Sequence, residues 1–157
     1  TSVWRSGGGD TTKTAYAGSM LMVADFYFSA TGAANTKVQK SSSDTNNLIL
    51  PVGAIITEIQ ANAAGTGGSS PTFDMGFTLY SSGTTNNATL LNEADADAGK
   101  QVFTWATATV PGASLGAVMS TSELVYITGR KGSSAATGGS ISGRITYYVP
   151  TSGAYTA

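Results

Sequence analysis

The stretch Asn47–Asn62, NLILPVGAIITEIQAN, is the densest apolar run in the chain and decides the fold class. Pro51-Val52-Gly53 divides it into a short strand, a turn and a longer strand, because proline cannot donate a hydrogen bond within a sheet. The longer strand alternates between two faces, with Ile55, Thr57, Ile59 and Ala61 on one and Ile56, Glu58, Gln60 and Asn62 on the other. This period of two, together with the β-branched residues, predicts a half-buried strand.

Alternation of the same kind recurs along the chain, between loops rich in glycine and serine. The stretches are Met20–Phe28, Pro71–Tyr80, Gln101–Val110, Glu123–Arg130 and Ser140–Pro150. Both faces of Met20–Phe28 are apolar, which predicts a strand that is covered on both sides. We also expect Pro71–Tyr80 to pair with the strand before it as two antiparallel strands joined by a long loop.

The pattern of elements predicts an all-β protein. There are seven or eight strands, and only Thr89–Gly99 favours a short helix, capped by Gly99, with a loop as the alternative. We therefore predict a single antiparallel β-sandwich that is jelly-roll-like in topology. Residues 1–17 are predicted to be a flexible N-terminal arm, residues 18–150 the sandwich domain, and residues 151–157 a C-terminal tail.

The composition argues against most catalysis. The 157 residues include no Cys and no His, which excludes thiol nucleophiles, Ser-His-Asp chemistry, and metal sites with thiolate or imidazole ligands. Charged residues make up 11% of the chain, with a net charge of −1 and no run of Lys or Arg. No apolar run reaches the ~18 residues of a membrane span. We therefore predict no enzymatic activity, no cofactor, and neither nucleic acid nor membrane as a partner.

One short sequence matches a catalytic motif. Gly112–Gly116, GASLG, has the G-x-S-x-G spacing that presents a nucleophilic serine on a strand-to-helix turn in hydrolases. The motif needs a His base and a following helix, and the sequence offers neither. We interpret it as a chance match in a loop rich in Gly and Ser.

An acidic cluster is the other candidate for chemistry. Glu93, Asp95 and Asp97 stand at positions i, i+2 and i+4, a spacing of oxygen ligands that can bind calcium. The distal ligands of a calcium loop are missing, so a solvated acidic turn is the favoured interpretation, with metal binding left open. Glycoside hydrolysis by two carboxylates is also left open, although nothing singles out a pair.

Val3, Trp4 and Arg5 form an apolar and cationic island within the glycine-rich N-terminal residues. Aromatic side chains and Arg are enriched at protein interfaces. We predict that these three residues dock on a partner, with packing on their own domain as the alternative.

Three stretches together resemble one class of proteins. LPVGAIITEIQANA (residues 50–63), FDMGFTLY (73–80) and GGSISGRITYYVP (138–150) resemble small β-sandwich virion proteins of tailed bacteriophages, of the capsid decoration or cement type. The likeness covers roughly residues 47–150 and rests on an L-P-x-G-A strand entry, a strand with a central Gly, and a last strand ending in Tyr-Tyr-Val-Pro. The N-terminal arm is not part of it.

The resemblance implies a structural role. It implies a jelly-roll-like domain, often a homotrimer, that binds the major capsid protein on the capsid surface of the virion and stabilises the shell, with no catalytic residues. The alternative is a carbohydrate- or receptor-binding β-sandwich module of a phage fibre or appendage, in which exposed Tyr and Trp residues stack on sugars.

Overall fold

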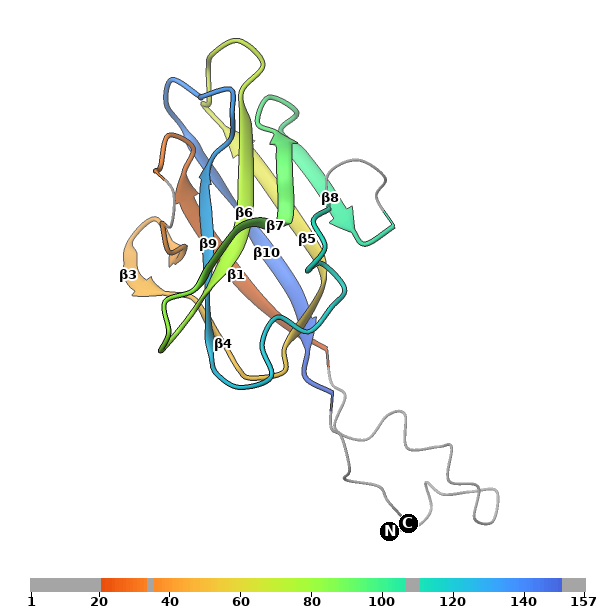
Figure 1. Cartoon of the computed structure of the whole chain (residues 1–157). Helices are drawn as coiled ribbons and strands as arrows, with labels where there is room; N and C mark the ends of the chain where they lie inside the picture. Colours follow the sequence, from red (N-terminus) through yellow and green to blue (C-terminus); the bar gives the residue numbers. More distant parts are fainter. Residues whose placement is uncertain (1–20, 34–35, 107–110, 151–157) are drawn as a thin grey trace, which may run out of the picture.

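The computed structural model describes residues 21–33, 36–106 and 111–150. These residues contain ten strands and no helix (Figure 1). The strands are β1 (Met22–Ser29), β2 (Gln39–Ser41), β3 (Asp44–Asn47), β4 (Ile49–Leu50), β5 (Ile55–Ala64), β6 (Thr72–Leu79), β7 (Thr85–Asp95), β8 (Lys100–Thr104), β9 (Val125–Lys131) and β10 (Ser140–Tyr148).

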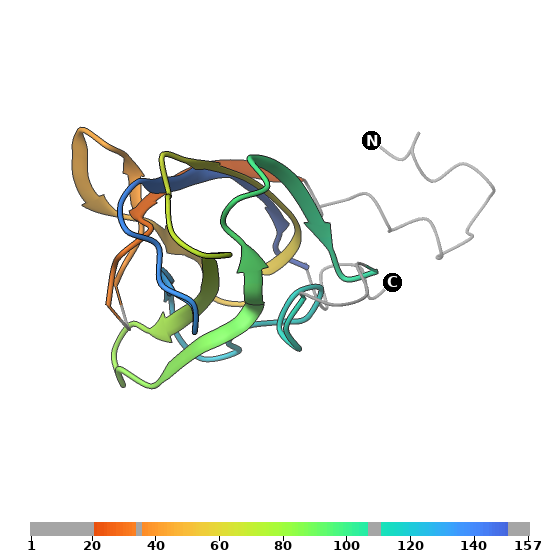
Figure 2. The ribbon, with the colours of Figure 1, turned by 90° about the horizontal axis from the view of Figure 1, so that it is seen from above.

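The strands form two antiparallel sheets around one core. The six-stranded sheet has the order β3-β2-β1-β10-β5-β8, and the four-stranded sheet has the order β4-β9-β6-β7. Apart from the small β2–β3 hairpin, the pairing is nested: β1 pairs with β10, β4 with β9, β5 with β8 and β6 with β7. This nesting is that of a jelly roll. The two sheets, seen from above in Figure 2, confirm the predicted β-sandwich.

The predicted pairing of Pro71–Tyr80 with the strand before it is wrong. β5 pairs with β10 and β8, whereas β6 pairs with β7 and β9 in the other sheet. The connecting loop crosses the sandwich and is held there by buried Thr66, whose Oγ1 donates to Ala96 O at 2.6 Å. The loop is therefore an arch between sheets and not a hairpin turn.

The helix predicted over Thr89–Gly99 is also wrong, because most of that stretch belongs to β7. Leu90, Leu91 and Ala94 are fully buried in the core between the sheets. β7 is irregular, since Phe73 of β6 lies opposite Ala94 while Met75 lies opposite Leu91. One extra residue of β7 is accommodated there, which breaks the alternation, and burial of the apolar side chains overrides the helical propensity of Ala, Leu and Glu.

β1 is covered on one face only. Phe26 and Phe28 point into the core, where their rings stack with centroids 6.2 Å apart. On the opposite face, Leu21 and Val23 are 63% and 57% exposed. The prediction of a strand covered on both sides is therefore wrong, because no described element packs on the outer face of the six-stranded sheet.

The central strand β5 contains a bulge that the alternation pattern missed. Thr146 of β10 lies opposite Glu58, but Tyr147 lies opposite Ile56, so Thr57 is an extra residue. Its hydroxyl donates to the Thr146 carbonyl at 3.2 Å. The bulge turns Ile56 into the core on the same side as Ile59, whereas strict alternation placed the two on opposite faces.

Residues 111–120 close one open side of the sandwich. Pro111 forms a bridge to Leu91 of β7, and Val118 forms a bridge to Ile55 of β5, so the segment links an edge of the small sheet to the large one. The GASLG sequence lies within it. A Cβ at Gly112 would stand 2.1 Å from Thr89 O, so glycine is required there by a close backbone approach.

Candidate functional site

The predicted docking residues Val3, Trp4 and Arg5 lie outside the described residues, and so do the predicted arm and tail. Their role stays a prediction. Within the described part of the chain there is no helix with the length and apolarity needed to cross a bilayer.

The acidic residues of the cluster are turned toward different partners. The Glu93 carboxylate accepts hydrogen bonds from Thr72 Oγ1 at 2.6 Å and from the Ser133 backbone N–H at 2.9 Å. Asp95 Oδ1 instead accepts from the backbone N–H of Asp97 at 2.7 Å, an exposed local turn. No three acidic side chains in the described ranges gather in a way that would hold a metal ion.

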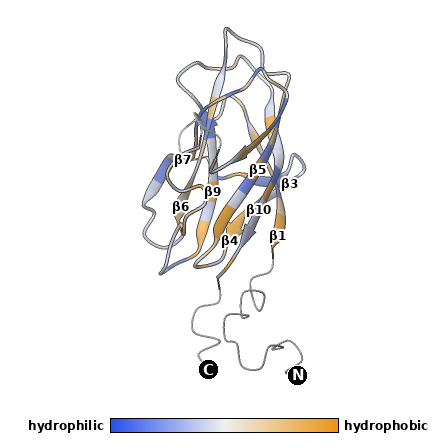
Figure 3. Cartoon of the chain, turned by 90° about the vertical axis from the view of Figure 1, so that its right-hand side faces the viewer, coloured by the Kyte–Doolittle hydropathy of each residue, from blue (hydrophilic) through white to orange (hydrophobic). Residues whose placement is uncertain are grey.

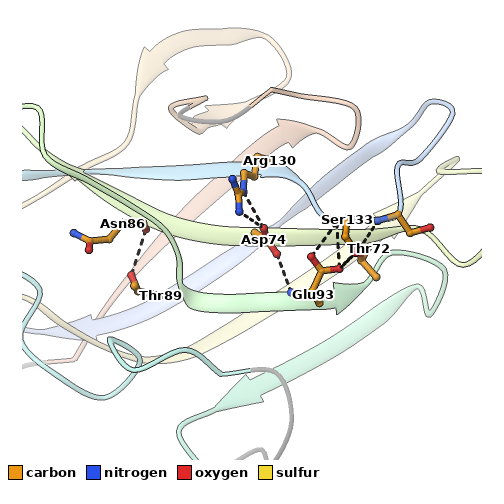
Figure 4. A network of polar contacts seen from close by, with 8 residues as sticks. Thr72, Asp74, Asn86, Thr89, Glu93, Arg130 and Ser133 are labelled. Carbon is orange, nitrogen blue, oxygen red and sulfur yellow. Dashed lines mark hydrogen bonds and ion pairs between the residues drawn. The ribbon is translucent and has the colours of Figure 1, made fainter.

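Among the residues that the structure describes, the most buried ionisable group is Asp74, which the sequence did not single out as a site. Its side chain lies in β6 and is 1% exposed. Oδ2 accepts from Arg130 Nε and lies 2.8 Å from Arg130 Nη2, while Oδ1 accepts from the backbone N–H of Glu93 at 2.8 Å (Figure 4). The carboxylate therefore ties β6 to both of its neighbours, β9 and β7. Because both oxygens are engaged, the carboxylate is placed to stabilise the sheet.

Glu93 has a lowered pKa. The hydrogen bond from Thr72 is the main cause, helped by the Ser133 donors and the positive charge of Arg130, and partly opposed by desolvation. The residue also has a positive φ of 57°, which fits the irregular backbone of β7 at this point. Its carboxylate links Thr72, the first residue of β6, to Ser133, which follows the end of β9.

Glu93 gives the protein an acid-sensitive contribution to stability. Because its pKa is lower in the folded state, this contribution is complete above the ordinary value of 4.5 and is lost as the pH falls through the folded value. We expect the free energy of unfolding to decline less steeply between about pH 5 and about pH 2 in Glu93→Gln than in the wild type. Urea unfolding across that range measures both slopes, and identical slopes would contradict this role.

Two tyrosines stack on the outer face of the four-stranded sheet. The Tyr80 and Tyr126 rings have centroids 5.1 Å apart, and Lys37 Nζ lies 4.0 Å from the Tyr126 ring centre. Tyr126 is thus engaged by two neighbours within its own chain. Tyr80 is 48% exposed, so part of its ring surface is free to stack on a sugar.

The most unusual surface lies at the end of the sandwich where β1 begins and β10 ends. We call it the apolar end surface and define it by its exposed side chains, which are Leu21, Val23, Val52, Trp105 and Val118. Figure 3 shows hydrophobic segments gathered toward this end, at the start of β1 and along β4. Trp105 is 72% exposed, the highest value among the large apolar residues that the structure describes.

The members of the apolar end surface are connected through paired backbone. Next to Leu21, Met22 pairs with Tyr147; the following residue, Tyr148, pairs with Ile55, which bridges to Val118. Gly116, two residues before Val118, lies against the side chain of Trp105, since a Cβ at Gly116 would be 3.1 Å from Trp105 Cβ. These contacts place Leu21, Val118 and Trp105 toward one end of the sandwich, with Thr146 and Glu58 standing between Val23 and β8 on the outer face.

Sequence reasoning missed this surface, although a signal was present. Met20–Phe28 is apolar on both faces, and the structure shows that only one face is covered. A strand with two apolar faces is compatible either with burial on both sides or with one exposed face that contacts another protein.

Comparisons with known proteins add little beyond the fold. No protein-family model matches the chain, and no curated protein matches it. The chain is similar to a solved structure of the capsid asymmetric unit of cyanophage Pam1, with 16% sequence identity, covering 85% of this chain and 88% of that one, and a TM-score of 0.47.

Proposed function

We propose that this protein is a structural component of a tailed-phage virion, a decoration protein that binds the major capsid protein on the outside of the shell. Two things support the proposal. The first is the resemblance carried by residues 50–63, 73–80 and 138–150. The second, and the observation that carries it, is the apolar end surface, which is suited to contact another protein.

The apolar end surface is hard to explain in a protein that acts alone. Soluble monomers rarely leave large apolar side chains exposed together, and such regions usually contact other proteins. Trp105 has the character of an interface anchor, because buried Trp residues contribute a large part of binding energy. Leu21 and Val23 add further exposed apolar area toward the same end of the sandwich. We infer that these side chains become buried against the shell.

The chain's connectivity supports the same assignment. Residues 1–20 join the domain at Leu21, within the apolar end surface. Twenty residues reach at most about 66–72 Å when fully extended. The Val3-Trp4-Arg5 island is therefore tethered close enough to bind the same partner, and two linked contacts strengthen each other through effective concentration.

We propose further that the assembled form is a homotrimer and that the protein has no enzymatic activity. The trimer is supported by the resemblance alone, and sedimentation of the purified protein tests it. The proposal that the protein has no enzymatic activity is supported by the lack of His and Cys. It is also supported by Asp74 and Glu93, whose carboxylates form hydrogen bonds that hold strands together.

A binding assay on shells tests the proposed function. Shells that lack the protein are mixed with wild type, Trp105→Ser, a variant without residues 1–10, or the control Tyr80→Ser, which changes an exposed aromatic on the outer face of the other sheet. We expect Trp105→Ser and the shortened chain to bind at least tenfold more weakly than the wild type, in line with the loss of an interface anchor. Tyr80→Ser should bind as tightly as the wild type. Wild-type binding by both altered proteins would overturn the proposal.

The alternative, a carbohydrate- or receptor-binding module of a fibre or appendage, is favoured by a different surface. That surface is polar and lies on the outer face of the six-stranded sheet. It is compatible with shell binding, because the two surfaces use different side chains.

A further inference from the structure

A shallow trough crosses the outer face of the six-stranded sheet. Two depressions of about 460 and 410 Å³ lie on either side of β10 and share Gly143 and Arg144 as lining residues. The first extends over β1 to Lys40 and Ser42, beside β2, and the second extends over β5 to Lys100 in β8. Together they form a trough on both sides of β10 that is lined by charged and polar side chains and by the exposed Val102, and that no described element covers.

The sheet register places the lining side chains in two adjacent rows. One row runs Asp25, Arg144, Gln60 and Val102, and the next runs Tyr27, Ser142, Asn62 and Lys100. Residues directly opposite each other in neighbouring strands point to the same face, so each row is a line of side chains across the sheet. From β2 to β8 the trough spans four strand spacings, or about 19 Å. This length suits an extended ligand better than a single small molecule.

The trough concentrates positive charge in a chain whose net charge is −1. It is lined by three of the six Lys and Arg residues in the described ranges, namely Lys40, Lys100 and Arg144. The ammonium groups of both lysines form no ion pair or hydrogen bond within the described part of the chain.

Arg144 is only weakly engaged. Its one ion pair within the described ranges joins Nε to Asp25 Oδ1 at 3.8 Å, and both side chains are more than half exposed. Such an exposed pair contributes little to stability, so the guanidinium is available to a ligand. On the neighbouring strand, Glu58 accepts from Gln60 Nε2 at 2.8 Å, which holds the Gln60 side chain along the trough.

We propose that this trough binds an acidic polysaccharide, a chain of sugars that carry carboxylates. The three cations match carboxylates, and Arg144 can bind one with two parallel hydrogen bonds. The amides of Gln60 and Asn62, with the hydroxyls beside them, match sugar hydroxyls.

Other extended ligands fit less well. The face of a paired sheet offers no free backbone groups for an added peptide strand. Single-stranded nucleic acid is bound largely by stacking of its bases on aromatic rings, and of the two aromatic residues that line the trough Phe26 is buried in the core, which leaves Tyr27.

Calorimetric titration with polygalacturonate tests the proposal, with uncharged dextran and poly-L-glutamate as comparison polymers. We expect wild-type protein to bind polygalacturonate at least tenfold more tightly than either of the others, because one lacks the charge and the other lacks the hydroxyls. Absence of binding to polygalacturonate, or equal binding to any of the comparison polymers, would overturn it.

Matched variants locate the binding. Arg144→Gln should weaken polygalacturonate binding at least tenfold, whereas Lys131→Gln, at an exposed lysine that lines neither depression, should leave it unchanged. Arg144 is exposed, so its replacement does not disturb the core. Equal effects of the two substitutions would show that charge alone matters and would refute the trough. Trp105→Ser should bind the polymer normally, which separates this result from shell binding.

Discussion

Asp74→Ala is expected to lower the free energy of unfolding by about 3 kcal/mol. The substitution leaves the Arg130 guanidinium, which is 31% exposed, without its partner, and it leaves the backbone N–H of Glu93 without an acceptor. Breaking one side of a buried pair typically costs about 3–5 kcal/mol, and the partial exposure of Arg130 places this site at the lower end. For a chain of this size the melting temperature should fall by roughly 9 °C.

Asp25→Ala is the matched control for that measurement. Asp25 also lies on a strand and faces an arginine, but its pair with Arg144 is 3.8 Å long and exposed. Exposed pairs contribute about 0–1 kcal/mol, so this variant should unfold at nearly the wild-type urea concentration. If the two variants unfold together, the Asp74 network does not stabilise the sheet in the way its geometry indicates.

Gly76→Ala is expected to have the largest effect of any single added methyl group. Gly76 lies in β6 where β7 departs from regular pairing, and a Cβ there would stand 1.7 Å from the backbone oxygen of Asn86. A clash with backbone cannot be relieved by rotating a side chain, so the two strands must separate. We expect a loss of at least about 3 kcal/mol and a low yield of soluble protein.

Gly138→Ala provides the control for Gly76. A Cβ at Gly138 meets its nearest neighbour, the Gly65 oxygen, at 3.8 Å, which is ordinary contact, and Gly138 has no positive φ. Its stability should change by less than about 1 kcal/mol. Urea unfolding of both variants decides the matter, and a Gly76→Ala protein as stable as the control would mean that β7 adapts without cost.

The sandwich was predictable because apolar and polar residues alternate along most of the strands. β6 and β10 show it clearly, with Phe73, Met75 and Phe77 on one buried face and Ile141 and Ile145 on another. Single-residue bulges in β5 and the larger irregularity in β7 were not predictable, because each is decided by a partner strand far away in sequence. The same holds for the partners of Asp74, since Arg130 is 56 residues distant and leaves no local pattern.

The candidate surfaces were harder to foresee than the fold. Alternation tells which residues share a face of a strand, but not which face other elements will cover. The trough depends on the register that aligns Asp25, Arg144 and Gln60 across three strands. The apolar end surface depends on where the closing segment passes Trp105. Both follow from tertiary arrangement and therefore became visible only in the structure.

The position of β10 has a consequence for how the chain is made. β10 is the last strand in sequence among the described residues, yet it lies between β1 and β5 in the middle of the six-stranded sheet. During synthesis, the edges of β1 and β5 that pair with β10 stay unpaired until residues 140–148 leave the ribosome. Unpaired strand edges can form hydrogen bonds with other chains. Because this step joins the two ends of the domain, it has a high contact order and is slow. Each newly made copy of the protein therefore passes through a period in which the position between β1 and β5 is unfilled and a strand of another chain can pair there.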